Sequence, residues 1–545
     1  MSVNIIPLPA AKPGHRDARE VEWQLECTDL GSVRRWLEDH GTVDGLTLEP
    51  RSTLEIFDTY LDTDDWRIHR AGFALRVRSE SGTTEATLKS LHSAGTEVAD
   101  RRELTETLAG SDSEAIRDLA GPVGARVAAV SGSRTLLPLF ELRTSRQRFA
   151  VRKSDEARQL GEIALDETVI SRPHGEPETS LLRVEVEALT ESHAPLRSLV
   201  KTLRSNCALE AASDTKYSLG LKSVGLAPPA EEFAATAVDA SMTIGEVAMA
   251  NLRRYMAAWL LHEPGARLGD DPEELHDLRV AGRRLDAILR QFRSFLPPEI
   301  SKIRATLKTV LSALGHVRDL DVALSELQDF SRKMPKANRA AAEPLKEHLM
   351  SERGRARSQM LSALDSIWVQ KNLQELTSLS GKPAASEASG ADLALFVSPG
   401  LIRQRFRKLR KRADRLGANS STDEYHDVRG QVKKLRYALE SVAALYGKPA
   451  DEMVRALRRW QENLGLQQDA AVAVQRLNAL AGAKPLGLPA ETLFMMGRLA
   501  ERHLGTAAEA RKRCAAGYRK VRQKWKKLRT KFEKSTANAV PAAVP

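Results

Sequence analysis

The sequence contains few cysteines, few aromatic residues and no long apolar runs, and these shortages exclude several classes of protein. Cys27, Cys207 and Cys514 are the only cysteines among 545 residues, and their wide spacing excludes a disulfide framework or a cysteine zinc site. No segment approaches the roughly 18 consecutive apolar residues of a membrane span. The first residues also lack the basic start and apolar core of a secretory signal. We therefore expect a cytosolic globular protein.

The positive charge of the chain is concentrated near its C-terminus. The net charge is +11 overall, but residues 1–230 hold 29 Lys and Arg against 36 Asp and Glu, a net charge of −7. Residues 401–545 hold 32 against 13, a net charge of +19. This asymmetry predicts a polyanionic partner for the C-terminal part. Charge alone leaves nucleic acid, acidic lipid and polyphosphate open.

The pattern of apolar residues divides the chain into two parts. Polar and apolar residues alternate, as in strands, in EVEWQLE, FALRVRSE, EATLKS, RFAVRKS, GEIALDE and LLRVEVEAL, all before residue 220. From about residue 240 the apolar residues recur at the three- and four-residue spacing of amphipathic helices. We expect an N-terminal tail (1–17), an α+β domain (18–222), a linker (223–240), an all-α domain (241–530) and a disordered tail (531–545).

The helical part contains an internal repeat. HDLRVAGRRL begins at His276 and HDVRGQVKKL at His426, 150 residues later. LGHVRDLDVA begins at Leu314 and LGLQQDAAVA at Leu464, again 150 residues later. Two matches that share one offset predict a duplicated helical unit with pseudo-symmetric halves. The predicted copies span about 241–377 and 400–530.

Charged residues occupy alternate positions in nearly every strand-like segment. Residues i and i+2 share one face of a strand, and the pairs are Glu20 with Glu22, Arg76 with Arg78, Arg101 with Glu103, Arg146 with Arg148, and Glu185 with Glu187. A single pair is typical of a solvated face, whereas the whole set predicts the polar lining of a closed barrel. Carboxylates hold hard divalent cations, and Arg and Lys bind phosphate oxygens. The pattern predicts a metal-dependent site for a phosphorylated anion.

Residues 18–222 resemble the CYTH domain of the triphosphate tunnel metalloenzymes, which include inorganic triphosphatases, thiamine triphosphatases and class IV adenylate cyclases. The resemblance rests on EVEWQLE, YLDTDDWRIHRAGFALRVR, TLKS, RRELTE, PLFELRTSRQRF, GEIALDE, VEVEAL and SDTKYSLGL, in that order. It implies an antiparallel β-barrel that uses Mg²⁺ or Mn²⁺. The implied metal ligands are Glu20, Glu22, Asp166, Glu185 and Glu187. The implied triphosphate-binding residues are Arg76, Arg78, Lys89, Arg101, Arg146 and Lys216, with Glu103 as a support residue. Catalysis is assigned to Glu20, Glu22, Arg76, Arg78 and Lys89.

One position departs from the family pattern. The family opens with Glu-x-Glu-x-Lys, whereas this chain has Gln24 in place of the lysine. A glutamine can hydrogen-bond a phosphate oxygen but supplies no charge. Weaker substrate binding or turnover is the expected consequence, and restoring lysine is expected to raise activity if the missing charge is limiting.

Each copy of the repeat places a histidine and several bases on one helix face. His276, Arg279 and Arg283 follow the spacing i, i+3, i+7, and His426, Arg429, Lys433 and Arg436 continue it to i+10. One such stripe is typical of a solvated face, but its duplication favours a function. Two facing stripes would line a basic cleft.

Residues 240–530 resemble the CHAD domain, a helical domain associated with polyphosphate. The resemblance rests on HDLRVAGRRL, LGHVRDLDVA, HDVRGQVKKLR and LGLQQDAAVA. It implies two pseudo-symmetric helical bundles that bind long-chain polyphosphate, and a place on polyphosphate granules. The implied contacts are His276, Arg279, Arg283, Arg284, His426, Arg429, Lys433, Lys434 and Arg436.

Two further basic runs, 401–415 and 511–529, contain the aromatic residues Phe406, Tyr518 and Trp525. Aromatic rings among bases can stack on nucleobases, so single-stranded nucleic acid is an alternative partner. Polyphosphate contact, or burial of the rings in amphipathic helices, explains the same pattern.

Together these patterns predict metal-dependent hydrolysis of inorganic triphosphate or short polyphosphate, with the helical part binding long polyphosphate. A non-enzymatic, granule-associated polyphosphate-binding protein is the first alternative. An organic triphosphatase or a cyclase-like nucleotide enzyme is the second. The sequence does not indicate an oligomeric state.

Overall fold

The computed structural model describes residues 15–91, 99–110, 112–154, 158–190, 193–228, 237–296, 300–381, 392–417, 420–482 and 487–539. The chain divides into two compact units. The first contains residues 1–230 and 267–271, and the second contains 231–266 and 272–545.

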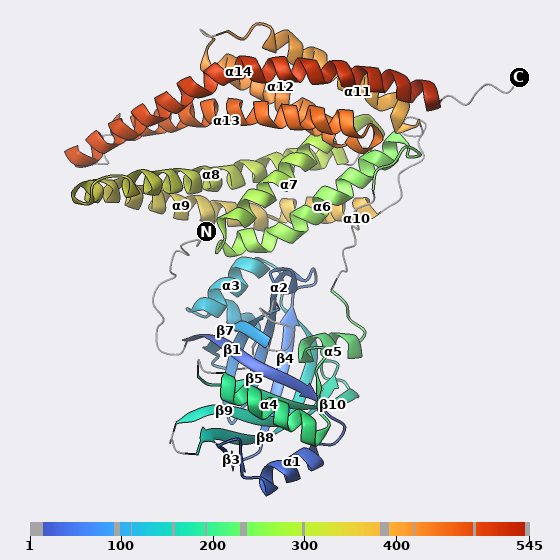
Figure 1. The fold of residues 1–545 in the computed structure, drawn as a ribbon, viewed down its shortest axis with the longest axis vertical. Helices are drawn as coiled ribbons and strands as arrows, with labels where there is room; N and C mark the ends of the chain where they lie inside the picture. Colours follow the sequence, from blue (N-terminus) through green and yellow to red (C-terminus); the bar gives the residue numbers. More distant parts are fainter. Residues whose placement is uncertain are drawn as a thin grey trace, which may run out of the picture. The chain divides into compact units, whose positions relative to one another are not determined.

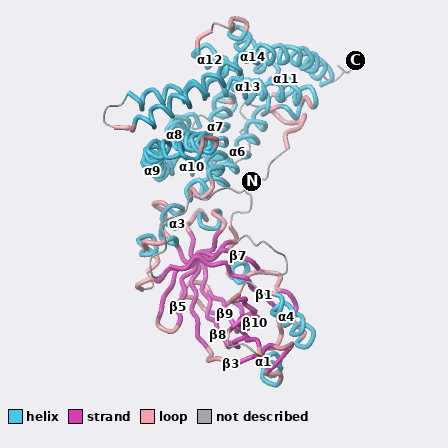
Figure 2. The backbone as a smooth tube through the Cα atoms, turned by 60° about the vertical axis from the view of Figure 1, so that its left-hand side comes forward, coloured by secondary structure: helices cyan, strands magenta, loops and turns pink. Residues whose placement is uncertain are grey.

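A closed antiparallel barrel forms the centre of the first unit (Figures 1 and 2). Its strands are β1 (His15–Glu26), β4 (Leu54–Asp62), β5 (Phe73–Glu80), β6 (Thr83–Ser90), β7 (Ala99–Thr107), β8 (Leu137–Lys153), β9 (Gln159–Ser171) and β10 (Pro177–Ala188). They pair in the order β8-β4-β5-β6-β7-β1-β10-β9, and the pairing of β9 with β8 closes the ring. The short strands β2 (Thr42–Val43), β3 (Leu46–Pro50) and β11 (Glu210–Ala211) lie outside this ring. The predicted antiparallel barrel is confirmed.

The apolar outer face of the barrel packs against the helices α1 (Leu30–Asp39), α2 (Arg67–Arg70), η1 (Glu114–Asp118), α3 (Pro122–Ser131) and α4 (Ala194–Cys207). Helix α5 (Lys216–Ser223) instead packs on the inward-facing Tyr60 and Phe140. Trp23 and Leu25 of β1 and Val186 of β10 pack in one buried cluster with apolar residues of α1 and α4. Because side chains alternate along a strand, the intervening Gln24 and Glu185 face the barrel interior.

Strand β4 was not expected from the sequence, although it supplies part of the barrel wall. Its pairing with β8 shifts register between Tyr60 and Leu61. This irregularity interrupts the alternation of polar and apolar residues. The expected strands in the other segments are all present.

In the described residues of the second unit, the regular secondary structure is helical apart from one isolated bridge. Its helices are α6 (Ile244–Leu268), α7 (Pro272–Gln291), η2 (Arg293–Phe295), α8 (Ile300–Arg332), η3 (Lys336–Ala342), α9 (Glu343–Asp365), α10 (Ile367–Gly381), α11 (Ala394–Ala413), α12 (Thr422–Glu440), η4 (Ala443–Leu445), α13 (Lys448–Gly482) and α14 (Ala490–Ala539). Helices α6, α7 and η2 begin 150 residues before α11, α12 and η4 respectively. The repeat in the sequence is thus a repeat of helices.

The two copies are joined rather than independent. One hydrophobic core contains buried residues from both copies, including Trp259 and Trp460. The amide of Ile244 donates to the carbonyl of Asp392 (2.9 Å), and the amide of Ala394 donates to that of Met242 (3.0 Å). These reciprocal bonds link equivalent helix starts.

Helix α14 corrects the prediction of a disordered tail from residue 531, because the helix continues to Ala539. Residues 540–545 lie outside the described part of the chain. Within the described residues, no helix combines the length and apolar character needed to cross a bilayer.

Candidate functional site

The interior of the barrel encloses a cavity of about 1930 Å³, called the tunnel cavity below. Alternate residues of the strands line it, as the spacing of the charged pairs predicted. The lining includes Glu20, Glu22, Arg76, Arg78, Lys89, Arg101, Glu103, Arg146, Glu185, Glu187 and Lys216. Asp166 is the exception among the predicted residues, because it faces inward but is fully buried beneath Arg146 and Lys216.

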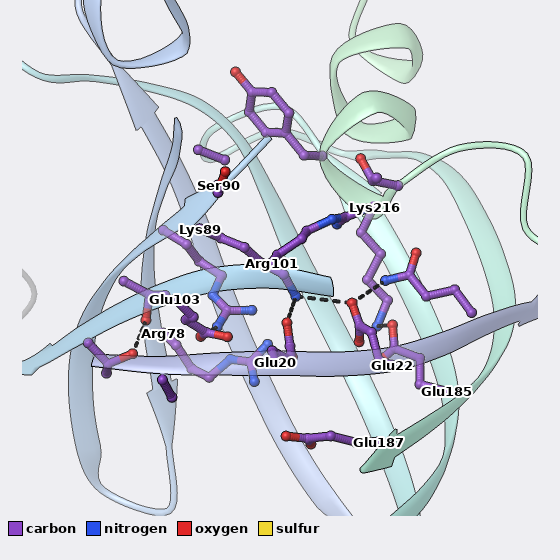
Figure 3. A pocket seen from close by; sticks show the side chains of 18 of the residues that line it. Glu20, Glu22, Arg78, Lys89, Ser90, Arg101, Glu103, Glu185, Glu187 and Lys216 are labelled. Carbon is purple, nitrogen blue, oxygen red and sulfur yellow. Dashed lines mark hydrogen bonds and ion pairs between the residues drawn. The ribbon is translucent and has the colours of Figure 1, made fainter. Parts of the chain in front are cut away.

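Lys89 of β6 joins two carboxylates of β1. Its ammonium group pairs with Glu20, and Nζ lies 3.2 Å from Oε1 of Glu22 (Figure 3). Glu22 also accepts a hydrogen bond of 2.8 Å from the amide of Gln24. Burial raises the pKa of Glu22, and so do the negative charges of Glu20 and Glu185. One lysine therefore compensates incompletely for the negative charge at this wall.

Two arginines of β5 are held by carboxylates at the opposite wall. Arg78 forms a bidentate pair with Asp58 of β4, with N–O distances of 2.7 and 2.8 Å. Nη2 of Arg76 lies 3.3 Å from Oε1 of Glu103, as expected for a support residue. Although burial opposes ionisation, Arg78 and Arg76 lower the pKa of Asp58 to about 2. The carboxylates of Asp58 and Glu103 thus fix the positions of the two guanidinium groups beside the cavity.

Arg146 and Lys216 converge on a buried pair of carboxylates. Arg146 donates to both oxygens of Asp166 (2.7 and 2.6 Å) and to Oε2 of Glu185 (2.6 Å). Lys216 pairs with Asp166 and lies 3.0 Å from Oε1 of Glu185. Despite burial, Lys216 and Arg146 hold the pKa of Glu185 well below its usual range. Two cations are thus positioned by two carboxyl groups.

Helix α5 presents Lys216 to the cavity. Thr215 caps the helix N-terminus by accepting a hydrogen bond from the amide of Ser218. Gly220 packs directly on Phe140 of β8, where an added Cβ would lie 2.1 Å from a ring carbon. Only glycine permits this close approach, so the packing fixes the helix and its first residue against the barrel.

Glu187 carries the least compensated charge of the predicted metal ligands. It has no ion pair within the described residues, and Figure 3 shows it apart from the linked Glu20 and Glu22. Burial, together with the charges of Glu20 and Glu22, raises the pKa of Glu187 to about 7. No three acidic, His or Cys side chains in the described ranges are arranged as a metal cluster. The converging carboxylates nevertheless have the oxygen chemistry and the excess negative charge that suit a divalent cation.

The Glu187 carboxylate is expected to make stability depend on pH. Its pKa of about 7 in the fold exceeds the ordinary value of 4.5. Its stabilising contribution is therefore complete below about pH 4.5 and is lost as the pH rises through 7. Glu187→Gln is expected to raise the free energy of unfolding at pH 8, without metal, by on the order of 2–3 kcal/mol.

Denaturant unfolding at pH 5 and pH 8 measures this effect. Glu178→Gln, which alters an exposed pair with Arg172, is the matched control. Mg²⁺ is expected to stabilise the wild type more than Glu187→Gln at pH 8. Equal pH profiles for the wild type and Glu187→Gln would refute the prediction.

Sequence reasoning missed several residues of the cavity and its wall. Asp58 and Tyr60 lie on the unpredicted strand β4, although their i, i+2 spacing was an available signal. His69 and Tyr217 also line the cavity, and Nδ1 of His69 lies 3.1 Å from the hydroxyl of Tyr217. Nothing in their local sequence indicated that they would meet.

In the helical unit, the basic stripes of the two copies converge. The central basic cluster comprises Arg279, Arg283 and Arg290 of α7 and Arg429 and Lys433 of α12. Burial lowers the pKa of Lys433 to about 8, and the charges of the four arginines contribute. Arg283, Arg290 and Lys433 have no ion-pair partner in the described part of the chain. Such uncompensated positive charge suits a polyanion.

The second repeated motif supports this cluster symmetrically. Nη2 of Arg279 lies 3.6 Å from Asp319, and Nη2 of Arg429 lies 3.7 Å from Asp469, 150 residues further on. At Gly315, an added Cβ would lie 3.3 Å from Arg279. In both LGHVRDLDVA and LGLQQDAAVA, the glycine lies against an arginine of the neighbouring helix, and the aspartate pairs with that arginine.

Two of the predicted polyphosphate contacts are engaged with one carboxylate. Arg284 of α7 pairs with Glu440 of α12 (2.6 Å) and lies over the rings of Tyr255 and Tyr437, so it joins the two copies. Arg436 is buried and pairs with the same Glu440 within α12 (2.8 Å). Contact of these two arginines with polyphosphate stays a prediction. The other predicted contacts on these two helices are at least partly exposed: His276 on α7, and His426 and Lys434 on α12.

The aromatic residues of the two basic runs lie within the helical unit. Phe406 is buried and stacks on Trp525, with ring centroids 3.9 Å apart. Tyr518 stacks on the buried Trp460 and donates a hydrogen bond to Asp414. The rings thus pack against helices, as in the burial interpretation.

Polyanion binding is expected to charge Lys433. A bound phosphate chain favours the ammonium form, so binding at pH 8.5–9 should take up close to one proton per site through this residue. Calorimetry in buffers of different ionisation enthalpy measures that uptake. Lys433→Met should abolish most of it, whereas Lys346→Met, which removes an exposed lysine paired with Glu343, should not. Unchanged uptake in Lys433→Met would contradict the assignment.

Comparisons with known proteins identify both units. Residues 35–218 match the family model of the CYTH domain, and residues 250–478 match that of the CHAD domain. Both resemblances expected from the sequence are confirmed. A search of curated protein sequences finds no match.

Several solved structures are similar to parts of the chain. The CHAD domain from the plant Ricinus communis is 27% identical, with 52% of this chain and 94% of that chain covered and a TM-score of 0.45. PptA from Streptomyces chartreusis is 19% identical, with coverages of 51% and 100% and a TM-score of 0.42. The putative adenylyl cyclase HpAC1 from Hippeastrum, described as having a dominant triphosphatase activity, is 15% identical, with coverages of 38% and 98% and a TM-score of 0.28.

Proposed function

Because the chain contains a CYTH domain followed by a CHAD domain, we propose that it hydrolyses inorganic triphosphate or short polyphosphate and also binds long-chain polyphosphate. The tunnel cavity would carry the hydrolysis, and the central basic cluster would bind the polymer. One observation carries the proposal. A single cavity combines fixed Arg and Lys groups on its walls with carboxylates, and burial together with the repulsion of neighbouring carboxylates raises the pKa of Glu187 to about 7.

The cations of the tunnel cavity suit a chain of phosphates. Arg101 lines the cavity without an ion pair among the described residues, so its guanidinium group is available to an anion. Arg76, Arg78, Lys89, Arg146 and Lys216 are already oriented by carboxylates. Such preorganised donors can stabilise charge that develops on phosphate oxygens without reorganising. These residues would bind and orient the substrate.

Glu20, Glu22 and Glu187 would hold a Mg²⁺ or Mn²⁺ ion. When bound, the ion would supply charge neutralisation and an activated water. Asp166 and Glu185 pair with Arg146 and Lys216. We assign these two acids mainly to positioning the cations. Their role as metal ligands, which the family resemblance implies, stays a prediction.

The central basic cluster would bind long polyphosphate in the helical unit. Arg279 and Arg429 suit bidentate contacts with phosphate, whereas Lys433 acts as a point charge. His276 and His426 flank these residues on the same helices and can add hydrogen-bond donors. Polymer bound there would tether the protein to polyphosphate granules. Binding of this kind should weaken as salt increases.

One observation favours a second candidate, a protein that binds phosphate chains with little turnover. Gln24 lines the tunnel cavity where the family has lysine, and its amide is engaged with Glu22. A neutral side chain at this position removes one charge from the substrate site. The second candidate would retain the binding of triphosphate and polyphosphate but not their hydrolysis.

A substrate panel tests the proposal. Phosphate release would be measured from inorganic triphosphate, ATP and thiamine triphosphate, each with Mg²⁺ and with Mn²⁺. The proposal predicts the highest kcat/KM for inorganic triphosphate. Faster hydrolysis of ATP or thiamine triphosphate would contradict it and indicate an organic triphosphatase. Binding of triphosphate without any phosphate release would favour the binding protein.

A further inference from the structure

Arg183 of β10 is a buried cation on the inward face of the barrel, two residues before the cavity-lining Glu185. In the strand register it lies opposite Glu26 of β1 and Asp166 of β9. Its side chain is 0% exposed, and its guanidinium group lies 3.3 Å from Glu26 and 3.4 Å from Oε1 of Gln24. Its Nε atom has no hydrogen-bond partner among the described residues. The sequence reasoning did not identify this residue.

The contact with Arg183 decides which way the Gln24 amide points. A guanidinium group can only donate hydrogen bonds, so the carbonyl oxygen of Gln24 must face Arg183. The NH₂ group then faces the opposite direction, where it donates to Oε1 of Glu22 at 2.8 Å. Arg183 and Glu22 therefore hold the amide from its two ends in a single orientation.

The charge of Arg183 is only partly compensated. The ion-pair partner Glu26 is 43% exposed, so solvent screens its negative charge more than it screens the buried guanidinium. Gln24 is neutral and lines the cavity, whereas Arg183 does not line it. A covered positive charge therefore lies on β10 next to the position where a cavity-facing lysine of β1 would stand.

We propose that Arg183 is a positioning residue for the phosphate chain. It orients Gln24 as a hydrogen-bond donor and supplies, from the adjacent strand, the positive charge that a lysine at position 24 would carry. This inference rests on the proposed binding of triphosphate in the tunnel cavity. It implies that Gln24 is not simply a lost lysine, because the charge has moved from β1 to β10.

A double-mutant cycle of Gln24→Lys and Arg183→Met tests the inference. Triphosphate affinity would be measured by calorimetry with EDTA present, and kcat and KM with Mg²⁺. Arg183→Met is expected to weaken triphosphate binding about tenfold or more, the cost of losing a charged hydrogen bond. Arg172→Met, which removes an exposed arginine from the same unit, is expected to change it less than about twofold.

The response to lysine distinguishes the inference from a purely structural role for Arg183. In the wild type, Gln24→Lys should not improve binding or turnover, since it places a second cation against Arg183. In the Arg183→Met background, the same change should restore binding to within about threefold of wild type. Thermal unfolding would verify that each variant is folded. If Arg183→Met does not fold, failure of Gln24→Lys alone to improve binding still supports the inference.

Three results would overturn the inference. One is wild-type affinity in folded Arg183→Met. Another is an equal gain in triphosphate affinity from Gln24→Lys in the wild type and in Arg183→Met. The third applies if Arg183→Met does not fold, and is a gain in triphosphate affinity from Gln24→Lys alone. Absence of phosphate release in a wild type that binds triphosphate would refute the proposed hydrolysis, whereas the binding cycle would still test Arg183. A wild type that does not bind triphosphate would refute both.

Discussion

Replacing Asp166 with asparagine is expected to reduce phosphate release from triphosphate about a hundredfold or more. The same change should lower the free energy of unfolding by about 3–5 kcal/mol. Asp166 is fully buried and pairs with both Arg146 and Lys216. Its neutralisation leaves two cations to share the single carboxylate of Glu185, so they repel each other and leave their positions beside the substrate.

Asp17→Asn provides a matched control for Asp166→Asn. Asp17 pairs with Arg102 at 2.8 Å, but about half of each side chain is exposed. Exposed pairs contribute about 0–1 kcal/mol, so this control should be close to wild type. Denaturant unfolding and phosphate-release assays measure both variants. Wild-type activity in Asp166→Asn would show that the buried carboxylate does not position the cations.

Removing Arg279, Arg429 and Lys433 together, each as a change to methionine, is expected to weaken long-chain polyphosphate binding about a hundredfold near physiological salt. The slope of log affinity against log salt should fall by about one for each lost phosphate contact. Arg279 and Arg429 occupy equivalent positions of the two copies, and together with Lys433 they concentrate positive charge at one place. Fluorescence anisotropy with labelled polyphosphate, from 50 to 500 mM salt, would measure both quantities.

The control for this triple variant removes the same charge elsewhere in the helical unit. Arg332, Lys346 and Lys512 are exposed and pair with acids on their own helices. Their combined change to methionine should alter affinity only a few fold. If both triple variants weaken binding equally, net charge rather than the central basic cluster determines polyphosphate binding.

Much of the barrel could be predicted from the sequence, because strand periodicity is a local property. Alternate charges in β1, β5, β8 and β10 indicated which side chains face inward, and the cavity lining agrees. Which acids pair with which bases was not predictable, since the pairing depends on register between distant segments. The pairing of Asp166 with both Arg146 and Lys216 is one such contact.

The helical unit shows the same division between local and distant information. Helix spacing placed Arg279 and Arg283 on one face, and the 150-residue offset predicted their counterparts. It did not show that Glu440 would pair with Arg284 and Arg436. Nor did it show that Arg290 would join the cluster around Lys433. The partners of a helical residue come from neighbouring helices, and a single stripe carries no information about them.

The most direct test of the account is phosphate release from inorganic triphosphate with Mg²⁺ and with Mn²⁺, for the wild type and for Glu185→Ala/Glu187→Ala. The double change removes Glu185, which pairs with Arg146 and Lys216, and Glu187, the least compensated carboxylate of the cavity. The account predicts metal-dependent release by the wild type and its loss in the folded variant. Release that is equal in both, or absent from a wild type that still binds polyphosphate, would contradict it.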